Sequence, residues 1–491
     1  MYKEAIQDAI SIHELPSKWS PEVLKEAKVV SNKRKDIKYI KDLTHLPFIT
    51  IDGEDAKDFD DAIFCKKNNK GFTLFVAIAD VSFYVEVDSK LDNEAKKRGT
   101  SVYFPGFVIP MLPEKLSNNV CSLRPYENRY VMVCEISINL KGKKNKYKFY
   151  KALINSKARL TYKEVELHIK KSKVFKESPT TNSVEALIKL TQKRLKIRKQ
   201  RKALEINPKE AILELNQNKE VSKIIVKKAL MAHKLVEESM LLANESAAAF
   251  IQDRYNFGVF RVHEDPDPSK LENLKKHFKM PSKIAKKLTP LEAINHCLNK
   301  ALETKDDTGQ ILVLQTLARA EYSEKNIGHF GLQLNQYAHF TSPIRRYPDL
   351  LVHRIINNSL TNKKIKMNKG YLKDECKSSS ILERRAEKAS RQVEQVLICL
   401  HLKKKIGLSI NGVIVGVTDF GLFVNLEPYF ISGLLHLSDL PQDYYQYFED
   451  ISTIKGRRTG KTYKLGQKIK VKIAAIIPLE RKITLLVAHG K

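Results

Sequence analysis

The ten residues from 52 to 61, DGEDAKDFDD, place six acidic side chains in one short segment. Like charges at this spacing repel one another, so the segment needs cations to neutralise it. Magnesium is a suitable cation because it prefers hard oxygen ligands in a tight octahedron. Asp58 and Asp60 point to the same side of an extended chain, with Asp52 before them and Asp61 after. Two ions bridged about 4 Å apart by these aspartates would support in-line attack of water on a phosphodiester.

A calcium-binding turn and a solvated acidic turn are the alternatives for this segment. The segment is not an EF-hand calcium loop, because it does not match the required D-x-[DN]-x-[DN]-G-x5-E pattern. A solvated acidic run in a basic protein should be interrupted by lysines, and only Lys57 interrupts this one. The composition and context together favour a metal site.

The whole chain is strongly basic. It has 87 Lys and Arg against 56 Asp and Glu, a formal charge of +31, which favours a polyanionic partner such as nucleic acid. A compositionally biased genome would also raise the lysine content, but it would not explain clusters. Residues 191–202 carry seven basic side chains and residues 455–472 carry eight, with no acid in either. We expect a solvated helix at the first cluster and a binding edge at the second.

The segments around the acidic loop predict the elements that position it. FITI before the loop and FTLFVAIADVSFYVEV after it have the β-branched and aromatic content of buried strands. Most segments between about 163 and 405 have helical periodicity, with strand-like interruptions at AILELN and FGVFRVH. We therefore predict an α+β fold, with short helices and a linker at 1–45 and one large domain of mixed sheet and helices at 46–405.

The last part of the chain, from 406 to 491, changes to short strands separated by glycines. Five such strands predict a small all-β barrel of the OB type.

The six cysteines form no C-x-x-C pair, so the sequence predicts neither a zinc site nor a disulfide framework. No apolar run approaches ~18 residues, the length that a membrane helix needs. We expect a soluble protein in the cytoplasm, without membrane contact.

Several sequence blocks resemble the RNB family of exoribonucleases, which includes ribonucleases II and R. The acidic segment lies in the first block, and the others follow in the family's order: FITIDGEDAKDFDDAIF, VAIADVSFYV, GTSVYFPGFVIPMLPEKLSNNVCSLRP, KARLTY, LVEESMLLAN and GHFGLQLNQYAHFTSPIRRYPDLLVHR. The last block is more similar to ribonuclease R. Family members usually carry cold-shock domains before the catalytic domain, and residues 1–45 hold at most a linker to such domains.

The resemblance implies roles for individual residues. Asp52, Asp58, Asp60 and Asp61 match the four metal-site aspartates, and Asp60 matches the one whose loss abolishes cleavage. Tyr103 matches an aromatic residue that clamps the terminal nucleotide, with a core tyrosine as the alternative.

Arg345 matches the arginine that holds the scissile phosphate, a role suited to a planar guanidinium. Arg346 is either its partner or part of a surface ion pair. Phe260 resembles a second stacking aromatic, with Phe257 as its rival and a core position as the alternative for both.

The C-terminal barrel resembles the RNA-binding repeat of ribosomal protein S1, through VTDFGLFVNL and SGLLHLSDL. The resemblance implies that Phe420, Phe423 and His436 face nucleic acid, while the lysines of 455–472 meet phosphates. The alternative for Phe423 is a place inside the barrel.

The resemblance as a whole implies processive hydrolysis of RNA from its 3′ end to nucleoside 5′-monophosphates. Two magnesium ions are the expected cofactors, with manganese as a substitute. The expected substrates are single-stranded RNA, RNA with a 3′ overhang and, as in ribonuclease R, structured RNA. We expect a monomer that associates with an RNA helicase or the ribosome. An inactive RNA-binding regulator of the same fold and a DNA nuclease are the rival functions.

Overall fold

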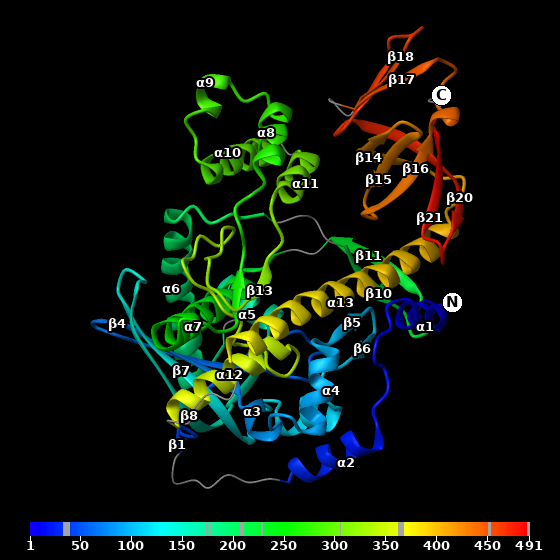
Figure 1. The fold of residues 1–491 in the computed structure, drawn as a ribbon. Helices are drawn as coiled ribbons and strands as arrows, with labels where there is room; N and C mark the ends of the chain where they lie inside the picture. The colour runs from blue at the N-terminus through cyan, green and yellow to red at the C-terminus, as the bar shows by residue number, and fades with distance from the viewer. Residues whose placement is uncertain are drawn as a thin grey trace.

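The computed structural model describes residues 1–32, 40–172, 175–176, 178–206, 211–226, 229–304, 306–361, 368–449 and 453–488. The other positions, which include parts of all three predicted domains, lie outside the described residues. The described chain forms a large α+β body, a helical unit above it and a β-barrel beside that unit (Figure 1).

A mixed sheet of seven strands, counted over the described residues, forms the centre of the large body, in the order β1-β8-β7-β4-β3-β2-β9. The pairs β1–β8 and β2–β9 are parallel and the other neighbours are antiparallel. The mixed sheet predicted from the sequence is thus confirmed. Its strands are β1 (Lys41–Asp42), β2 (Ile49–Asp52), β3 (Asp61–Asn68), β4 (Gly71–Ala79), β7 (Asn128–Asn139), β8 (Lys144–Asn155) and β9 (Ala158–Thr161).

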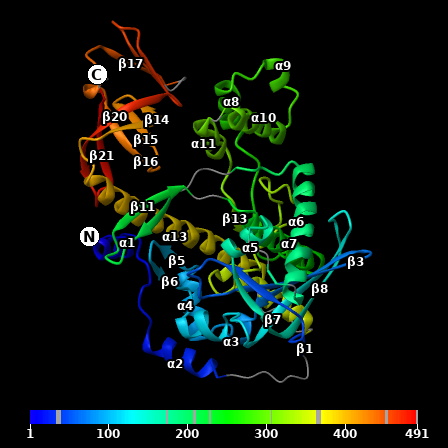
Figure 2. The ribbon, with the colours of Figure 1, turned by 180° about the vertical axis from the view of Figure 1, so that it is seen from behind.

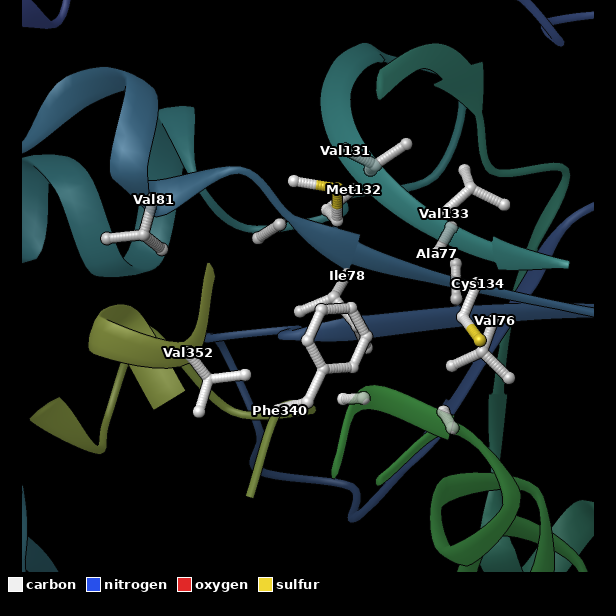
Figure 3. Close-up of a cluster of buried hydrophobic side chains, with 14 of the residues drawn as sticks. Val76, Ala77, Ile78, Val81, Val131, Met132, Val133, Cys134, Phe340 and Val352 are labelled. Carbon is white, nitrogen blue, oxygen red and sulfur yellow. The ribbon is translucent and has the colours of Figure 1, made fainter. Parts of the chain in front are cut away.

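Helices cover this sheet, as Figure 2 shows from behind. They are α3 (Val81–Tyr84), α4 (Lys90–Arg98), α5 (Tyr162–Ile169), α6 (Pro179–Gln200), α7 (Met231–Tyr255), α12 (Tyr347–Leu360) and α13 (Lys369–Lys403). The strand β4 is almost entirely buried, and β3 and β7 each contain a run of four buried residues, because helices pack on them. Figure 3 shows Ile78 of β4 and Met132 of β7 packed near Phe340 and Val352.

The basic cluster at 191–202 is only partly solvated, which corrects the prediction of a solvated helix. Arg194 and Arg198 of α6 turn inward and pair with Glu238 of α7 at 3.5 and 3.2 Å. Glu238 is buried, so the two arginines neutralise a carboxylate that would otherwise be expensive to bury.

A separate helical unit has its own apolar core. It consists of α8 (Pro268–His277), α9 (Ser282–Ala285), α10 (Pro290–Glu303) and α11 (Asp307–Thr316). The strands β12 (Phe260–Val262) and β13 (Glu321–Ser323) pair where the chain enters and leaves this unit.

Two small ribbons and the first N-terminal helix pack along α13. The ribbons are β5 (Val102–Phe104) with β6 (Phe107–Ile109), and β10 (Ala211–Leu215) with β11 (Val221–Val226). The helix α1 (Tyr2–Ile12) contacts α13, and α2 (Pro21–Val30) contacts α4. The predicted short helices near the N-terminus and the strand at AILELN are confirmed.

The end of the described chain forms a closed barrel of five strands, which confirms the predicted OB-type architecture. Its strands are β14 (Ser409–Thr418), β15 (Gly421–Leu426), β16 (Ile431–His436), β20 (Lys468–Ile477) and β21 (Lys482–Val487). A second sheet of β17 (Tyr445–Phe448), β18 (Thr453–Gly456) and β19 (Thr462–Lys464) extends from the barrel (Figure 1). Sequence reasoning missed this extension. Among the helices in the described ranges, none is long and apolar enough to cross a membrane.

Candidate active site

The acidic loop connects two neighbouring strands of the central sheet. Asp52 is the last residue of β2 and Asp61 is the first residue of β3. Because β2 and β3 pair antiparallel, the two aspartates lie at the same edge of the sheet. The strands therefore set the spacing between the first and last acids of the loop.

The loop between these strands is anchored by Phe59 and Ser122. The Phe59 side chain is buried, and its backbone N–H donates to Ser122 Oγ at 3.0 Å. Ser122 Oγ in turn donates to the Lys57 carbonyl at 2.7 Å, and the Leu123 N–H donates to the Phe59 carbonyl at 3.0 Å. Sequence reasoning missed Ser122, although it lies within the quoted NNVCSLRP block.

Burial and mutual repulsion hold three of the aspartates toward their protonated forms. Burial raises the pKa of Asp60 well above its usual range, and the Asp58 and Asp61 carboxylates raise it further against the opposing charge of Arg345. Burial, together with Asp52, raises the pKa of Asp61 to about 7. Burial also raises the pKa of Asp52, and Asp58 adds to this. The site thus gathers more negative charge than one arginine neutralises.

This donor set fits a hard divalent cation. Its members are carboxylate oxygens in a partly dehydrated place, where added positive charge would relieve their repulsion. Within the described residues, however, no three His, Cys, Asp or Glu side chains are grouped into a ready-made metal cage. Magnesium usually keeps several water ligands and takes others from substrate phosphates, so an open set of aspartates suits it better than a closed cage would.

Arg345 lies directly against Asp60. Its Nε is 3.5 Å from Asp60 Oδ2, its Nη2 donates to Ser342 Oγ at 3.0 Å, and its side chain is 41% exposed. The backbone N–H of Ile344 donates to Asp60 Oδ1 at 2.8 Å. Asp60 therefore joins the acidic loop to the segment that carries Arg345, and the arginine keeps an exposed edge for an anionic ligand.

Arg346 turns away from Arg345 into the protein. Its Nη2 donates to Asp349 Oδ1 at 2.7 Å, and the Asp349 side chain is fully buried. Asp349 also accepts the Ser342 backbone N–H at 2.8 Å. Of the two alternatives for Arg346, a partner of Arg345 and a surface ion pair, the structure shows an ion pair, which is buried rather than at the surface. The buried pair supports the loop on which Arg345 lies.

Tyr103 lies on β5, with its side chain 43% exposed. Its hydroxyl donates to Asp58 Oδ2 at 3.4 Å. The segment just before β5 is bonded to the Arg345 segment, because the Ser101 N–H and the Thr100 hydroxyl both donate to the Arg345 carbonyl at 3.0 Å. The structure therefore brings Tyr103, Asp58 and Arg345 together from distant parts of the chain.

Tyr162 and Arg159 also lie at the site, and sequence reasoning assigned neither of them. Tyr162 follows Thr161, the β9 residue that pairs with Asp52. Burial raises the pKa of Tyr162, and the Asp52 and Asp61 carboxylates raise it further. Arg159 donates to the Gly53 carbonyl at 3.3 Å and to the Glu54 carbonyl. The KARLTY block was the signal that could have revealed both.

Phe260 belongs to the apolar core, which corrects its expected role as a stacking residue. It lies on β12, is 0% exposed and packs in the same core cluster as Ile251 and Tyr322. A fully enclosed ring has no free face for a nucleobase. Its rival Phe257 is partly buried and packs on the edge of the same core.

The three aromatic positions predicted on the barrel lie side by side. Phe420 is 44% exposed, and its ring makes an edge-to-face contact with Phe423 at a centroid distance of 6.1 Å. His436 is exposed and pairs in register with Gly421, next to Phe420. Phe423 is half-buried, so it neither fills the barrel completely nor projects freely.

One face of α13 lines a cavity of about 660 Å³. Arg261 pairs with Glu383 at 2.6 Å and Arg384 with Glu321 at 2.5 Å at this cavity. Ser390 on the same wall donates to the Tyr103 carbonyl, so the cavity adjoins the strand that carries Tyr103. The charged lining is Arg261, Arg319, Glu383, Arg384, Glu387, Lys388, Arg391 and Glu394.

Comparison with known proteins agrees with this geometry. The RNB domain family model matches residues 40–362, and the S1 RNA binding domain model matches residues 403–487. Ribonuclease R of Buchnera aphidicola subsp. Schizaphis graminum is 41% identical over 506 residues, covering 98% of this chain and 68% of the relative. Ribonuclease R of Escherichia coli strain K12 is 39% identical over 505 residues, covering 98% of this chain and 61% of the relative. The chain thus spans between three fifths and seven tenths of the lengths of these relatives.

Solved structures are similar over nearly the whole chain. Mycoplasma genitalium RNase R in complex with ribose methylated single-stranded RNA has a TM-score of 0.94 at 30% identity, covering 99% of this chain and 78% of that one. The same enzyme in complex with double-stranded RNA has a TM-score of 0.87 at 28% identity, covering 99% and 83%. The chain therefore belongs to the RNB family of exoribonucleases, and its relatives over almost its whole length are ribonuclease R enzymes.

Proposed function

We propose that this protein hydrolyses RNA processively from the 3′ end and releases nucleoside 5′-monophosphates. The observation that carries the proposal is the Asp60–Arg345 pair, at 3.5 Å, within the complete set of four aspartates. Direction and product follow the family. The local chemistry supports metal-aided cleavage of a phosphodiester beside an arginine.

Asp52, Asp58, Asp60 and Asp61 are the proposed ligands of two magnesium ions, with manganese as a substitute. When bound, the ions supply an activated water and stabilise the leaving oxygen. Asp60, which accepts the Ile344 N–H with one oxygen, keeps its other oxygen toward Arg345 and the site.

Arg345 is the proposed phosphate-binding residue. Its exposed guanidinium can form charge-assisted hydrogen bonds to two oxygens of the scissile phosphate. Tyr103 is the proposed stacking residue for the terminal nucleotide, because its exposed ring lies beside Asp58.

The barrel is proposed to hold RNA that has not yet entered the active site. Phe420, Phe423 and His436 form an aromatic surface on which bases can stack, and the basic residues of 455–472 supply counter-charge for phosphates. The double-stranded RNA complex of the Mycoplasma genitalium relative supports structured RNA as a substrate besides single strands and 3′ overhangs.

We propose that residues 1–45 are an N-terminal segment, 46–405 the catalytic domain and 406–491 the RNA-binding domain. The cytoplasm is the proposed location, where the protein acts as a monomer together with an RNA helicase or the ribosome. All six cysteines are buried and free, which suits a reducing compartment.

The rival function is an inactive RNA-binding regulator of the same fold. Yeast Ssd1, a pseudonuclease, has a TM-score of 0.68 at 17% identity, which is a likeness of fold alone. The complete aspartate set and Arg345 favour an active enzyme here.

A 5′-labelled RNA and its DNA counterpart, each with magnesium or with EDTA, test the proposal. We expect RNA but not DNA to be shortened, and only when magnesium is present. Nucleoside 5′-monophosphates should accumulate. RNA that is bound but never shortened would favour the regulator, and equal loss of DNA would favour a DNA nuclease.

A further inference from the structure

The ribbon that carries Tyr103 has little support of its own. β5 and β6 are strands of three residues each and form a separate two-stranded sheet in the described structure, outside the central sheet. Such an isolated two-stranded ribbon is only marginally stable in water. The position of the Tyr103 ring therefore depends on the elements packed around the ribbon.

The helices α1 and α13 provide the core beneath this ribbon. Val102, Phe104 and Ile109 are buried in an apolar cluster together with side chains of both helices. The helix residues of this cluster are Ile6, Ala9, Ala386, Ala389, Val393 and Leu397. His13, just after α1, also contacts Gln392 of α13 at 3.0 Å. The ribbon is thus held between α1 and α13.

Two side chains hold the ribbon through its backbone, one at the middle of β5 and one at the turn that follows it. Ser390 Oγ of α13 donates to the Tyr103 carbonyl, and the Tyr2 hydroxyl of α1 donates to the Pro105 carbonyl at 2.7 Å. The turn between the strands is enclosed as well, since a Cβ at Gly106 would lie 3.3 Å from the Tyr2 hydroxyl and 3.1 Å from Leu215 Cδ1.

We propose that Tyr2 and Ser390 are positioning residues for Tyr103, and that α1 is a brace of the active site. The inference rests on the proposed function, because it concerns how the stacking tyrosine is held over the terminal nucleotide. It changes the role of the N-terminal segment, which the sequence presented as a linker. Neither positioning residue needs to touch RNA; each acts through the backbone of the ribbon.

The test uses Tyr2→Phe and Ser390→Ala in the full chain, with Ser390→Thr as the variant that retains the hydroxyl. Tyr255→Phe is the matched control, because Tyr255, the last residue of α7, packs against the apolar core of the large body rather than against the cluster beneath the ribbon. Hydrogen exchange of the peptide covering residues 100–110 reports on the ribbon. Quenching of a 3′-terminal 2-aminopurine RNA, in an Asp60→Asn background, reports on stacking.

We expect faster exchange confined to the ribbon and weaker quenching in Tyr2→Phe and Ser390→Ala. In the active background we expect kcat to fall about threefold to tenfold, the effect of losing one orienting hydrogen bond, with KM changed less than about twofold. Ser390→Thr should restore both signals, and Tyr255→Phe should match the wild type.

Hydrogen exchange of the ribbon that is unchanged in both Tyr2→Phe and Ser390→Ala would overturn the inference. Faster exchange with unchanged 2-aminopurine quenching and unchanged kcat would overturn it as well. Failure of the proposed function would look different, because the wild-type protein would then leave RNA intact with magnesium. The hydrogen-exchange result does not depend on cleavage, so it decides on the brace in either case.

Discussion

The backbone N–H of Ile344 donates to the Asp60 carboxylate at 2.8 Å, across 284 residues of sequence. The neighbouring Arg345 places its Nε 3.5 Å from the other oxygen of the same carboxylate. One aspartate thus connects the acidic loop after β2 to the segment before α12. Because Ser342, in that segment, is also bonded to the buried Asp349, the guanidinium is held from two sides. This arrangement gives Arg345 a fixed place beside the proposed metal ligands.

Replacing Arg345 tests its proposed contact with the phosphate. Arg345→Lys keeps the charge but removes the planar pair of donors, so kcat should fall about tenfold to a hundredfold. RNA affinity should change less than about threefold, because the barrel supplies other contacts. Arg124→Lys, at an exposed arginine paired loosely with Glu127, is the control. A kcat within twofold of the wild type would remove Arg345 from the reaction.

The raised pKa values of the aspartates predict a stability that depends on pH and metal. Asp61 titrates near pH 7 in the folded protein against an ordinary value of 3.8. A group with a raised folded pKa stabilises the fold fully below its unfolded pKa, and this stabilisation is lost as pH rises through the folded value. In EDTA, the Tm should therefore fall from about pH 4 to about pH 7, the range between the ordinary and the folded pKa of Asp61.

Magnesium should reverse this fall, and more strongly at pH 8 than at pH 6, because the ionised carboxylates bind the cation. Asp61→Asn removes the titrating group and should flatten the pH dependence in EDTA. The prediction would be contradicted if, in EDTA, the Tm of the wild type rose with pH over this range when compared with the Tm of Asp61→Asn.

The aromatic residues of the barrel should contribute to the binding of long RNA but not of short RNA. Phe420→Ala removes an exposed ring, which should weaken binding of RNA of about 20 nucleotides by roughly tenfold. We expect an RNA of about five nucleotides to occupy the active site alone and to bind Phe420→Ala as tightly as the wild type. Leu479→Ala, at another exposed apolar residue of the barrel, serves as the control. Equal weakening for both RNA lengths would argue against a role confined to the barrel.

Phe260 should affect stability rather than binding. Phe260→Ala leaves a cavity in the core and should lower the free energy of unfolding by about 3–5 kcal/mol. Phe260→Leu retains most of the volume and should keep the RNA affinity within about twofold. Denaturant unfolding and fluorescence anisotropy measure the two effects. A large affinity loss in Phe260→Leu with normal stability would restore the stacking role.

Local patterns in the sequence predicted the fold class, the barrel and the position of the acidic loop. The β-branched and aromatic content around FITI and the density of aspartates are local properties, and they identify strands and charge directly. The direction in which Arg346 points is not local, because it depends on the buried Asp349. Phe260 and Phe420 each lie within two residues of a glycine, Gly258 and Gly421, and only tertiary packing makes the first buried and the second exposed.

The N-terminal segment also shows that local patterns predict elements but not their long-range contacts. Its lysine-rich and apolar alternation predicted short surface helices, which α1 and α2 confirm. The hydrogen bond from Tyr2 to Pro105 joins residues 103 positions apart, and no periodicity within α1 indicates it. The roles of Tyr103 and Arg345 were likewise not predicted from local patterns. They came from the resemblance to a family, because the acidic loop alone contains no signal for either residue.

Asp60→Asn tests the central claim most directly. A 5′-labelled RNA is incubated with magnesium and the wild type, Asp60→Asn or Asp55→Asn, in which the last changes an exposed acid of the same loop. We expect Asp60→Asn to lose at least about a thousandfold in cleavage rate while its RNA affinity stays within about threefold, and Asp55→Asn to remain active. Full magnesium-dependent degradation by Asp60→Asn would contradict the proposed active site.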